Sequence, residues 1–152
     1  MYKNPLPAVK EILTHRPHLI IVHAEAQGDF NEVLDLCRQA EVKIGVALLP
    51  ATSPDYILSS LDLLDHVLIF SGDLGSFGGH ADLSLLAKVE TLKKHKPDLE
   101  IGWDGGVNIQ NVAQLVTGGV DVLNVGGYIQ KAADPAKAYS DLMRIADETG
   151  TT

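Results

Sequence analysis

The stretch LEIGWDGGV, residues 99–107, indicates the fold more directly than any other part of the chain. Residues 99–103 are typical of a buried strand, and an acid and two glycines follow at once. A second strand-like run, residues 120–125, ends in Gly126-Gly127 about twenty residues further on. Successive strands that end in glycine pairs are typical of the last two units of a (β/α)8 barrel, whose loops bind phosphate there. A chain of 152 residues is nevertheless too short to close such a barrel.

Length and composition indicate one folded domain, residues 1–152. Hydrophobic residues make up 45% of the chain, which separates it from disordered segments and provides for a core. The net charge of −8 argues against a nucleic-acid surface, which needs clustered Lys and Arg. We therefore expect a partner other than nucleic acid.

The single cysteine and the apolar runs indicate the cellular setting. Cys37 has no partner for a disulfide or a thiolate metal cluster, and its helical spacing predicts a core position. No apolar run approaches the roughly 18 residues of a membrane span, and the N-terminus lacks the pattern of a signal peptide. We expect a cytoplasmic protein that does not bind membranes.

Strand and helix patterns alternate along the chain. Apolar runs without polar alternation predict strands at residues 19–23, 43–48, 66–71, 99–103 and 120–125. Helical spacing predicts helices at residues 5–15, 31–40, 54–61, 83–95 (with Asp82 as N-cap), 112–116 and 136–149. Strands of this kind form a parallel sheet covered by helices, so the fold class is α/β with a five-stranded parallel sheet.

The residues that directly follow the strands are the candidate site, because ligands of parallel α/β sheets bind at the carboxyl ends of the strands. These residues are 23–25, 49–52, 71–80, 104–106 and 126–128. Three of the five segments are rich in glycine, which lets backbone N–H groups approach an anion closely. The alternative is that these glycines serve only the geometry of the turns. Three clusters at one edge favour a phosphate ligand.

Asp104 is the candidate for proton transfer or for binding a cation at this edge. Its alternative role is that of a turn residue or a helix N-cap. His23 and Glu25 lie on the same side of the chain and are better suited to orienting a substrate than to forming a metal site by themselves. His80 lies in a glycine-rich loop, where it could contact a phosphate. The other histidines we interpret as surface or capping groups: His15, His18, His66 and His95.

Four motifs carry a resemblance to a known family. They are VHAEA (residues 22–26), GVALLPAT (45–52), FGG (77–79) and DGGVN (104–108). In this order and at this spacing they resemble ribulose-phosphate 3-epimerases over nearly the whole chain. Allulose-phosphate epimerases share the aspartate before the glycine pair, whereas the related decarboxylases and hexulose-phosphate synthases typically lack it.

The resemblance implies a (β/α)8 TIM barrel that interconverts ribulose 5-phosphate and xylulose 5-phosphate, an isomerase reaction on a small phosphosugar. Two aspartates on opposite faces of the substrate exchange the C3 proton in that family, through an enediolate stabilised by a divalent metal ion (Zn, Fe, Mn or Co). The resemblance makes Asp104 the second catalytic aspartate and a metal ligand. It places six glycines around the phosphate: Gly78, Gly79, Gly105, Gly106, Gly126 and Gly127.

The chain also departs from this family. The first aspartate, two metal-binding histidines and a serine come from the family's first three strands, which have no counterpart here. We therefore expect this chain alone not to bind the metal tightly. The loop at residues 72–77 is one residue longer than in the family, Gly127-Tyr128 replaces a serine and an alanine, and Trp103 replaces a small aliphatic residue. The loop and tyrosine changes fall in the region expected to bind phosphate.

Five strands of an eight-stranded barrel form a partial barrel with two bare edges and an uncovered inner face. We expect Val46, Leu68 and Val122 on that face. Exposing several hundred Å² of apolar surface costs on the order of 10 kcal/mol. Three arrangements would cover it: a dimer of this chain, a rearranged sheet with a helix over the inner face, or a partner that supplies the N-terminal strands.

Three functions are consistent with these features. The first is an epimerase that is active only when another chain supplies the missing strands. The second is a half-barrel that binds a phosphosugar without turnover, and the third is a truncated remnant stabilised by oligomerisation. Because Asp104 is the only member of the proton-transfer pair in this chain, we expect no epimerase activity from the chain in isolation.

Overall fold

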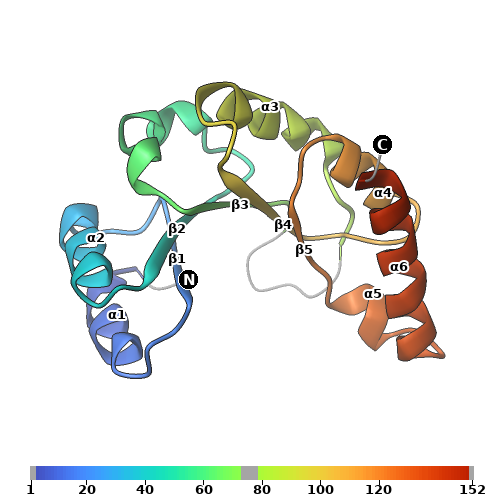
Figure 1. Ribbon diagram of the computed structural model, residues 1–152, viewed down its shortest axis with the longest axis horizontal. Helices are drawn as coiled ribbons and strands as arrows, with labels where there is room; N and C mark the ends of the chain where they lie inside the picture. Colours follow the sequence, from blue (N-terminus) through green and yellow to red (C-terminus); the bar gives the residue numbers. More distant parts are fainter. Residues whose placement is uncertain (1–2, 73–78, 151–152) are drawn as a thin grey trace.

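The protein is a parallel β-sheet with its helices along one side. The computed structural model describes residues 3–72 and 79–150. The strands are β1 (Leu19–His23), β2 (Lys43–Leu48), β3 (His66–Phe70), β4 (Glu100–Asp104) and β5 (Val122–Asn124), and they pair in the order β1-β2-β3-β4-β5. The helices are α1 (Leu6–Leu13), α2 (Phe30–Gln39), α3 (Leu86–His95), α4 (Val112–Thr117), α5 (Gly127–Gln130) and α6 (Pro135–Gly150). Figure 1 shows the sheet bent into an arch with the helices along its outer side.

The face of the sheet under the helices forms the core. Successive residues of a strand point to opposite faces, so every second residue faces the helices. In β1 to β4 these residues are at most 7% exposed: Ile20, Val22, Ile44, Val46, Leu48, Val67, Ile69, Ile101 and Trp103. Cys37 in α2 packs into the same core with no exposed surface, as its helical spacing predicted.

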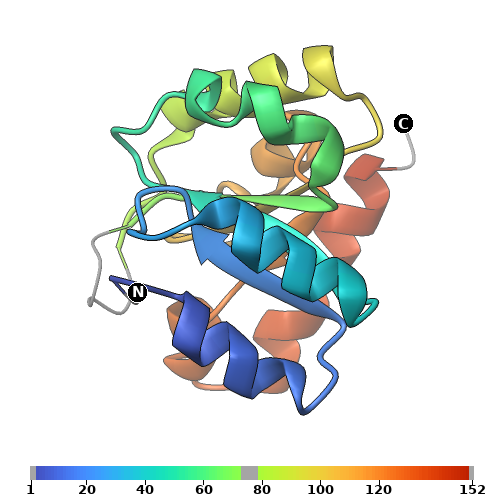
Figure 2. The same ribbon diagram turned by 90° about the vertical axis from the view of Figure 1, so that its left-hand side faces the viewer.

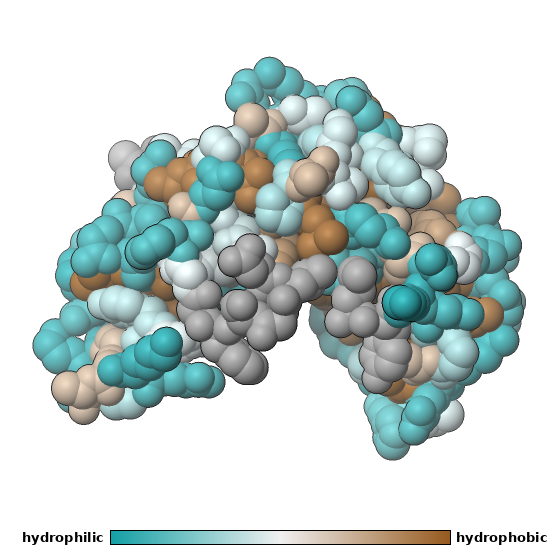
Figure 3. Space-filling model, turned by 180° about the vertical axis from the view of Figure 1, so that it is seen from behind, coloured by the Kyte–Doolittle hydropathy of each residue, from teal (hydrophilic) through white to brown (hydrophobic). Residues whose placement is uncertain are grey.

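We call the opposite side of the sheet the concave face. By strand register it carries Leu19, Ile21, His23, Lys43, Gly45, Ala47, His66, Leu68, Phe70, Glu100, Gly102, Asp104, Val122 and Asn124. No helix of the described chain covers this face, and Figure 3 shows the molecule hollowed between the two ends of the arch. Ile21 is 37% exposed and Val122 is 36% exposed, although both are apolar. The concave face is therefore the unfinished side of the sheet.

Within the described residues, both ends of the sheet are bare edges. The Ala24 N–H donates to the Ala47 carbonyl at 2.9 Å, so by alternation Ile21 and His23 direct their backbone groups away from β2. At the other end the Asp121 N–H donates to the Ile101 carbonyl at 2.8 Å, and Val122 directs its backbone groups outward. Figure 2 looks at the β1 end of the arch, where α1 and α2 flank the edge strand.

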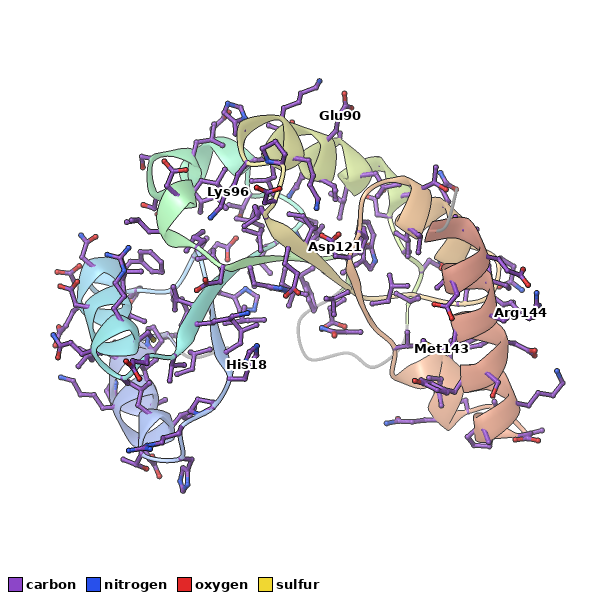
Figure 4. The ribbon with its side chains drawn as sticks, in the orientation of Figure 1. His18, Glu90, Lys96, Asp121, Met143 and Arg144 are labelled. Atoms are coloured by element: carbon purple, nitrogen blue, oxygen red, sulfur yellow. The ribbon has the colours of Figure 1, made fainter. Side chains whose placement is uncertain are left out.

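Two aspartates stabilise the end of the sheet where the strands begin. Asp65, just before β3, accepts a hydrogen bond from the Ile44 N–H at 2.9 Å. Asp121, labelled in Figure 4, lies just before β5. It accepts one hydrogen bond from the Ile101 N–H at 2.8 Å and another from the Lys93 ammonium at 2.8 Å. These acids have structural roles, which distinguishes them from the acid at the other end of β4.

The segment at residues 54–61 differs from its prediction. It forms two 3-10 turns, Pro54–Tyr56 and Leu58–Leu63, in place of one α-helix. The turns meet at Ile57, whose φ of −115° interrupts the helical path. Ile57 and Leu61 are still buried, so the apolar spacing predicted the buried side of the segment but not its hydrogen bonding.

Two predictions about the sheet faces are wrong. Val46 faces the helices and is 2% exposed, whereas Leu68 and Val122 do lie on the concave face. His66 is not a surface group, because its side chain lies flat on the sheet and is buried. Its Nδ1 lies 2.7 Å from the Glu100 carboxylate, and its ring occupies the space that a side chain at Gly102 would fill.

The last strand is shorter than predicted, since it spans three residues within the expected range 120–125. Asp82 is confirmed as an N-cap: its carboxylate accepts a hydrogen bond from the Ser84 N–H at 3.1 Å, at the start of the 3-10 turn Leu83–Leu85 that leads into α3. Within the described residues, no helix is long and apolar enough to cross a membrane.

Candidate active site

Asp104 is the last residue of β4 and lies on the concave face at the carboxyl ends of the strands. Its neighbours in register are Phe70 on β3 and Asn124 on β5. Burial raises the pKa of the Asp104 carboxyl above its ordinary value. In the parts of the chain that the structure describes, no group donates a hydrogen bond to this carboxylate. A half-buried carboxyl group without a partner is suited to accept and return a proton.

Three side chains hold the loop that follows Asp104. The Trp103 indole Nε1–H donates to the Gly105 carbonyl at 2.9 Å. The side-chain amides of Asn108 and Asn111 both donate to the Gly106 carbonyl, at 3.0 and 2.9 Å. These bonds fix the backbone directly after Asp104, so they also restrict the position of its carboxylate.

The Gly105-Gly106 pair is required by close packing of the backbone. Their φ angles are +119° and +69°, in the region that favours glycine. A Cβ on Gly105 would collide with the Ser71 carbonyl, and a Cβ on Gly106 would collide with the backbone of Ala81. The packing explains both glycines whether or not a phosphate binds here.

Gly79 and Gly126 have open surroundings. Among the described residues, no heavy atom lies within 4 Å of the position that a Cβ would take at Gly79 or at Gly126. Gly126 precedes the first turn of α5, which begins at Gly127 and was not predicted from the sequence. These glycines leave room at the strand ends, whereas Gly105 and Gly106 do not. Gly78 lies outside the described residues.

His23 and Glu25 lie close together beside this site, at the end of β1. His23 Nδ1 is 3.4 Å from a Glu25 carboxylate oxygen, Oε2, and among the described residues neither atom has a hydrogen-bond partner. The His23 ring also packs edge-on against Phe70, with 6.2 Å between ring centroids. The pair therefore connects the β1 end to the region of β3 beside Asp104.

Glu25 also holds the loop after β2. Its other carboxylate oxygen accepts hydrogen bonds from the Thr52 hydroxyl and, at 3.0 Å, from the Leu49 N–H. Burial alone would raise the pKa of Glu25, but these hydrogen bonds and the nearby His23 outweigh it, and the pKa lies below its ordinary value. Glu25 therefore stays ionised and acts as an acceptor.

Lys88 holds the same loop from the other side. Its ammonium donates to the carbonyls of Leu49, Pro50 and Thr52 at 2.8, 2.8 and 2.7 Å. Burial lowers the pKa of Lys88, against the opposing charges of Glu25 and Asp82. Sequence reasoning missed this residue, because its partners lie 36 to 39 positions away and no local pattern marks them.

The described residues contain no group of three or more His, Cys, Asp or Glu side chains that could hold a metal ion. Asp104 offers one carboxylate, and a divalent ion bound by protein needs several ligands. The residues present therefore do not fit a metal site by themselves. His80, the other predicted phosphate contact, is exposed beside the Gly106 loop.

The family profile and the curated relatives that match this chain carry the same name. The profile of the Ribulose-phosphate 3 epimerase family matches residues 1–130. The ribulose-phosphate 3-epimerase of Helicobacter pylori strain 26695 is 33% identical over 135 residues, which cover 86% of this chain and 62% of that protein. The enzyme of the same name from Bacillus subtilis is 34% identical over 130 residues, or 82% of this chain and 59% of that protein. The chain thus spans about three fifths of the length of these curated relatives.

Solved structures with a similar fold include TIM-barrel synthases. The 3-hexulose-6-phosphate synthase of Salmonella typhimurium superimposes with a TM-score of 0.74 at 18% identity, over 93% of this chain and 67% of that one. A second 3-hexulose-6-phosphate synthase gives a TM-score of 0.70 at 19% identity, over 91% of this chain and 67% of that one. At such identities the likeness concerns the fold: the arch is a part of a TIM barrel.

Proposed function

Because the chain belongs to the ribulose-phosphate 3-epimerase family, we propose that it forms the five C-terminal βα units of an epimerase site for a small phosphosugar such as ribulose 5-phosphate. The observation that carries this proposal is the Asp104 carboxyl group at the concave end of β4, which has no hydrogen-bond partner among the described residues. The proposal includes a cytoplasmic setting, in which the single buried Cys37 stays reduced.

Asp104 would exchange a proton with one face of the substrate. When its carboxylate takes the C3 proton, the C–H electron pair moves toward the carbonyl carbon and gives an enediolate, with the negative charge on oxygen. Return of a proton to the opposite face inverts C3 and gives the epimer. The described concave face offers no second carboxylate on that opposite face, since its other acid, Glu100, is paired with His66 at the far end of β4. The isolated chain would therefore not turn over.

Gly79 and Gly126 would contribute to a phosphate site at the strand ends, together with Gly78 and Gly127. The open space at Gly79 and Gly126 supports this role, because an anion could approach the backbone there. Gly105 and Gly106 would contribute through backbone N–H groups, but their packing accounts for them without a ligand.

A divalent metal ion would need ligands from outside this chain. Asp104 would supply one carboxylate oxygen, and the described residues lack the other ligands. We derive no catalytic step through a metal from this chain alone.

A phosphosugar-binding half-barrel without turnover is the second candidate function. It is favoured by one observation: the described rim holds one unpartnered carboxylate, whereas epimerisation needs two proton-transfer groups. Binding without chemistry is therefore expected of the isolated chain, and the two candidates differ only in what happens when the missing strands are supplied.

Binding of ribulose 5-phosphate tests the proposal directly. We expect the ³¹P signal of ribulose 5-phosphate to shift on addition of the chain. The dissociation constant from this titration should be at least about tenfold lower than that for inorganic phosphate. Gly126→Val fills the open space before α5 and should weaken binding about tenfold or more. Gly150→Val, which adds the same side chain at the end of α6, is the matched control.

Asp104→Asn should change the affinity by less than about threefold, since it keeps the shape of the site and removes one charge. Two results would contradict the proposal: sugar phosphate bound no better than phosphate alone, or binding that is unaffected by Gly126→Val. Circular dichroism of each variant establishes that the fold is retained.

A further inference from the structure

A cavity of about 300 Å³ lies on the helix side of the sheet, at the carboxyl ends of β1 and β2. The start of α1, the end of β1, the start of α2 and the 3-10 turns after β2 form its wall. Figure 1 shows α2 and these turns (green) as neighbours along the outer side of the arch. The end of β1, His23, also lines it, but no described residue of β3, β4 or β5 does. The cavity is therefore distinct from the site around Asp104.

The cavity lies where the segment after β2 departs from a regular helix. Packed α-helices interlock their rows of side chains and leave few voids between them. The segment here has two 3-10 turns instead, which meet at Ile57 with a φ of −115°. Ile57 and Ser60 line the cavity from these turns, and Val33 lines it from α2.

The inner wall of the cavity is apolar and buried. Val22, Val33 and Leu64 line it and are 7%, 1% and 1% exposed. Phe30 and Tyr56 also line it, and aromatic side chains pair favourably with a bound ring. An apolar cavity of roughly 150 Å³ holds benzene, so this one has room for a fused pair of rings.

The mouth of the cavity carries uncharged hydrogen-bonding groups. Asn4, Gln27 and Ser60 line it and are partly or largely exposed. The Asn4 side chain is fixed at this place, because its Oδ1 accepts the Leu6 N–H at 3.1 Å and lies 3.2 Å from the position of a Cβ on Gly28. Among the described residues, the Asn4 amide nitrogen, the Gln27 amide and the Ser60 hydroxyl have no hydrogen-bond partner. A ligand with rings in the cavity and a polar edge at its mouth would use them.

The charges around the cavity favour an uncharged ligand. Among the described residues that line it, none is Lys or Arg, and Asp29 carries the one carboxylate. This carboxylate is the N-cap of α2 and accepts the Asn31 N–H at 2.8 Å, so the positive end of the helix is already matched. An anion would meet Asp29 without a compensating cation, and a cation would lose its hydration against the apolar wall.

We propose that this cavity is a second ligand site, which binds an uncharged, planar heteroaromatic molecule of about the size of indole. Its rings lie against Val22, Val33 and Leu64, and its polar edge faces Asn4 and Gln27. The inference goes beyond the proposed function and does not rest on it, because the ligand is not a phosphate and binds on the other side of the sheet. Either one can fail while the other holds.

Titration of the full chain with indole tests the site. We expect the methyl signals of Val22, Val33 and Leu64 to shift in ¹H–¹³C NMR spectra, with a dissociation constant of about 1 mM or lower. The backbone signals of Asp104 and Gly105 should not move. Indole-3-acetate should bind at least about tenfold more weakly than indole-3-acetamide, which has the same shape without the charge.

Variants of two adjacent serines make the test specific. Ser60→Phe places a ring in the cavity wall and should weaken indole binding about tenfold or more. Ser59→Phe adds the same ring at an exposed neighbour that does not line the cavity, and binding should stay within about threefold. Circular dichroism of both variants establishes that the fold is retained. Ser60→Leu, a smaller filling of the same wall, should also weaken binding and replaces Ser60→Phe if that variant does not fold.

Three results would overturn the proposal. The first is the absence of methyl shifts at about 5 mM indole, well above the expected dissociation constant. The second is equal binding by the variants of Ser60 and Ser59, or equal binding of the acetate and the acetamide. The third is a set of shifts confined to concave-face residues such as Leu68, which would place indole on the other side of the sheet.

Discussion

The two faces of the same five strands differ in what they contribute. The face under the helices buries its side chains almost completely, as Ile101 and Trp103 illustrate with no exposed surface. The concave face carries Asp104 and exposes more than a third of Ile21 and of Val122. The comparison teaches that a part of a barrel can bury one face of its sheet fully under helices while the face that carries Asp104 stays partly uncovered.

Neighbouring isoleucines of β1 give the sharpest test of this difference. Ile20 faces the helices at 7% exposure, and Ile21 faces the concave side at 37%. We expect Ile20→Ala to lower the free energy of unfolding by about 3 kcal/mol and Ile21→Ala by about 1 kcal/mol or less. Urea unfolding of the two variants measures this difference. Equal losses would mean that the concave face is already covered in the free protein.

Substitution of the glycines at the strand ends should give the second-largest loss of stability. Gly106→Ala puts a Cβ against the backbone of Ala81 at a positive φ, and we expect it to cost about 2 kcal/mol or more. Gly126→Ala adds the same atom in open space and should cost less than about 1 kcal/mol. Thermal unfolding of both variants measures the effect. If Gly126→Ala costs as much as Gly106→Ala, the open space assigned to phosphate is not present.

The smallest expected effect is on the pH dependence of stability, because the pKa values of two carboxyl groups at the site are shifted in opposite directions. Burial raises the pKa of Asp104 above 3.8, so the folded state binds this proton more tightly than the unfolded chain, and the stability from this group falls as the pH rises through that range. Although burial opposes it, the hydrogen bonds from Thr52 and Leu49 hold the pKa of Glu25 below 4.5. The stability from Glu25 is therefore present above pH 4.5 and is lost as the pH falls through the lower pKa.

Substitutions at these two positions should move the pH dependence in opposite directions. Between pH 3 and 7, Asp104→Asn should raise the stability at the neutral end relative to the acidic end, and Glu25→Gln should lower it. Urea unfolding at a series of pH values follows both variants. Shifts of the same sign would contradict the assignment of an unpartnered carboxyl to Asp104 and a hydrogen-bonded one to Glu25.

The sequence was sufficient to predict the strands and the position of Asp104. Short apolar runs bounded by glycine or polar residues marked all five strands, and a parallel sheet places the residue after such a run at the ligand-binding edge. The family motifs were also readable, since they are contiguous stretches such as DGGVN.

It was harder to predict on which face of the sheet each strand residue lies. Strands that are apolar on both faces show no alternation of polar and apolar residues, so the sequence does not reveal that Val46 faces the helices. The burial of His66 depends on the absence of a side chain at Gly102, on the neighbouring strand. The role of Lys88 depends on carbonyl groups of a distant loop. These features arise from contacts between distant segments, which a local pattern does not encode.

The most direct test of the central claim is exchange of the C3 proton of ribulose 5-phosphate in D2O, followed by proton NMR. The chain alone should neither incorporate deuterium at C3 nor form xylulose 5-phosphate, because in the proposed site Asp104 supplies one group of a pair that proton transfer at C3 requires. With the part of the Helicobacter pylori relative that this chain does not match and a divalent metal ion both present, exchange should appear and should be lost in Asp104→Asn. Deuterium incorporation and epimerisation by the isolated chain, abolished by Asp104→Asn, would contradict the claim that its site is incomplete.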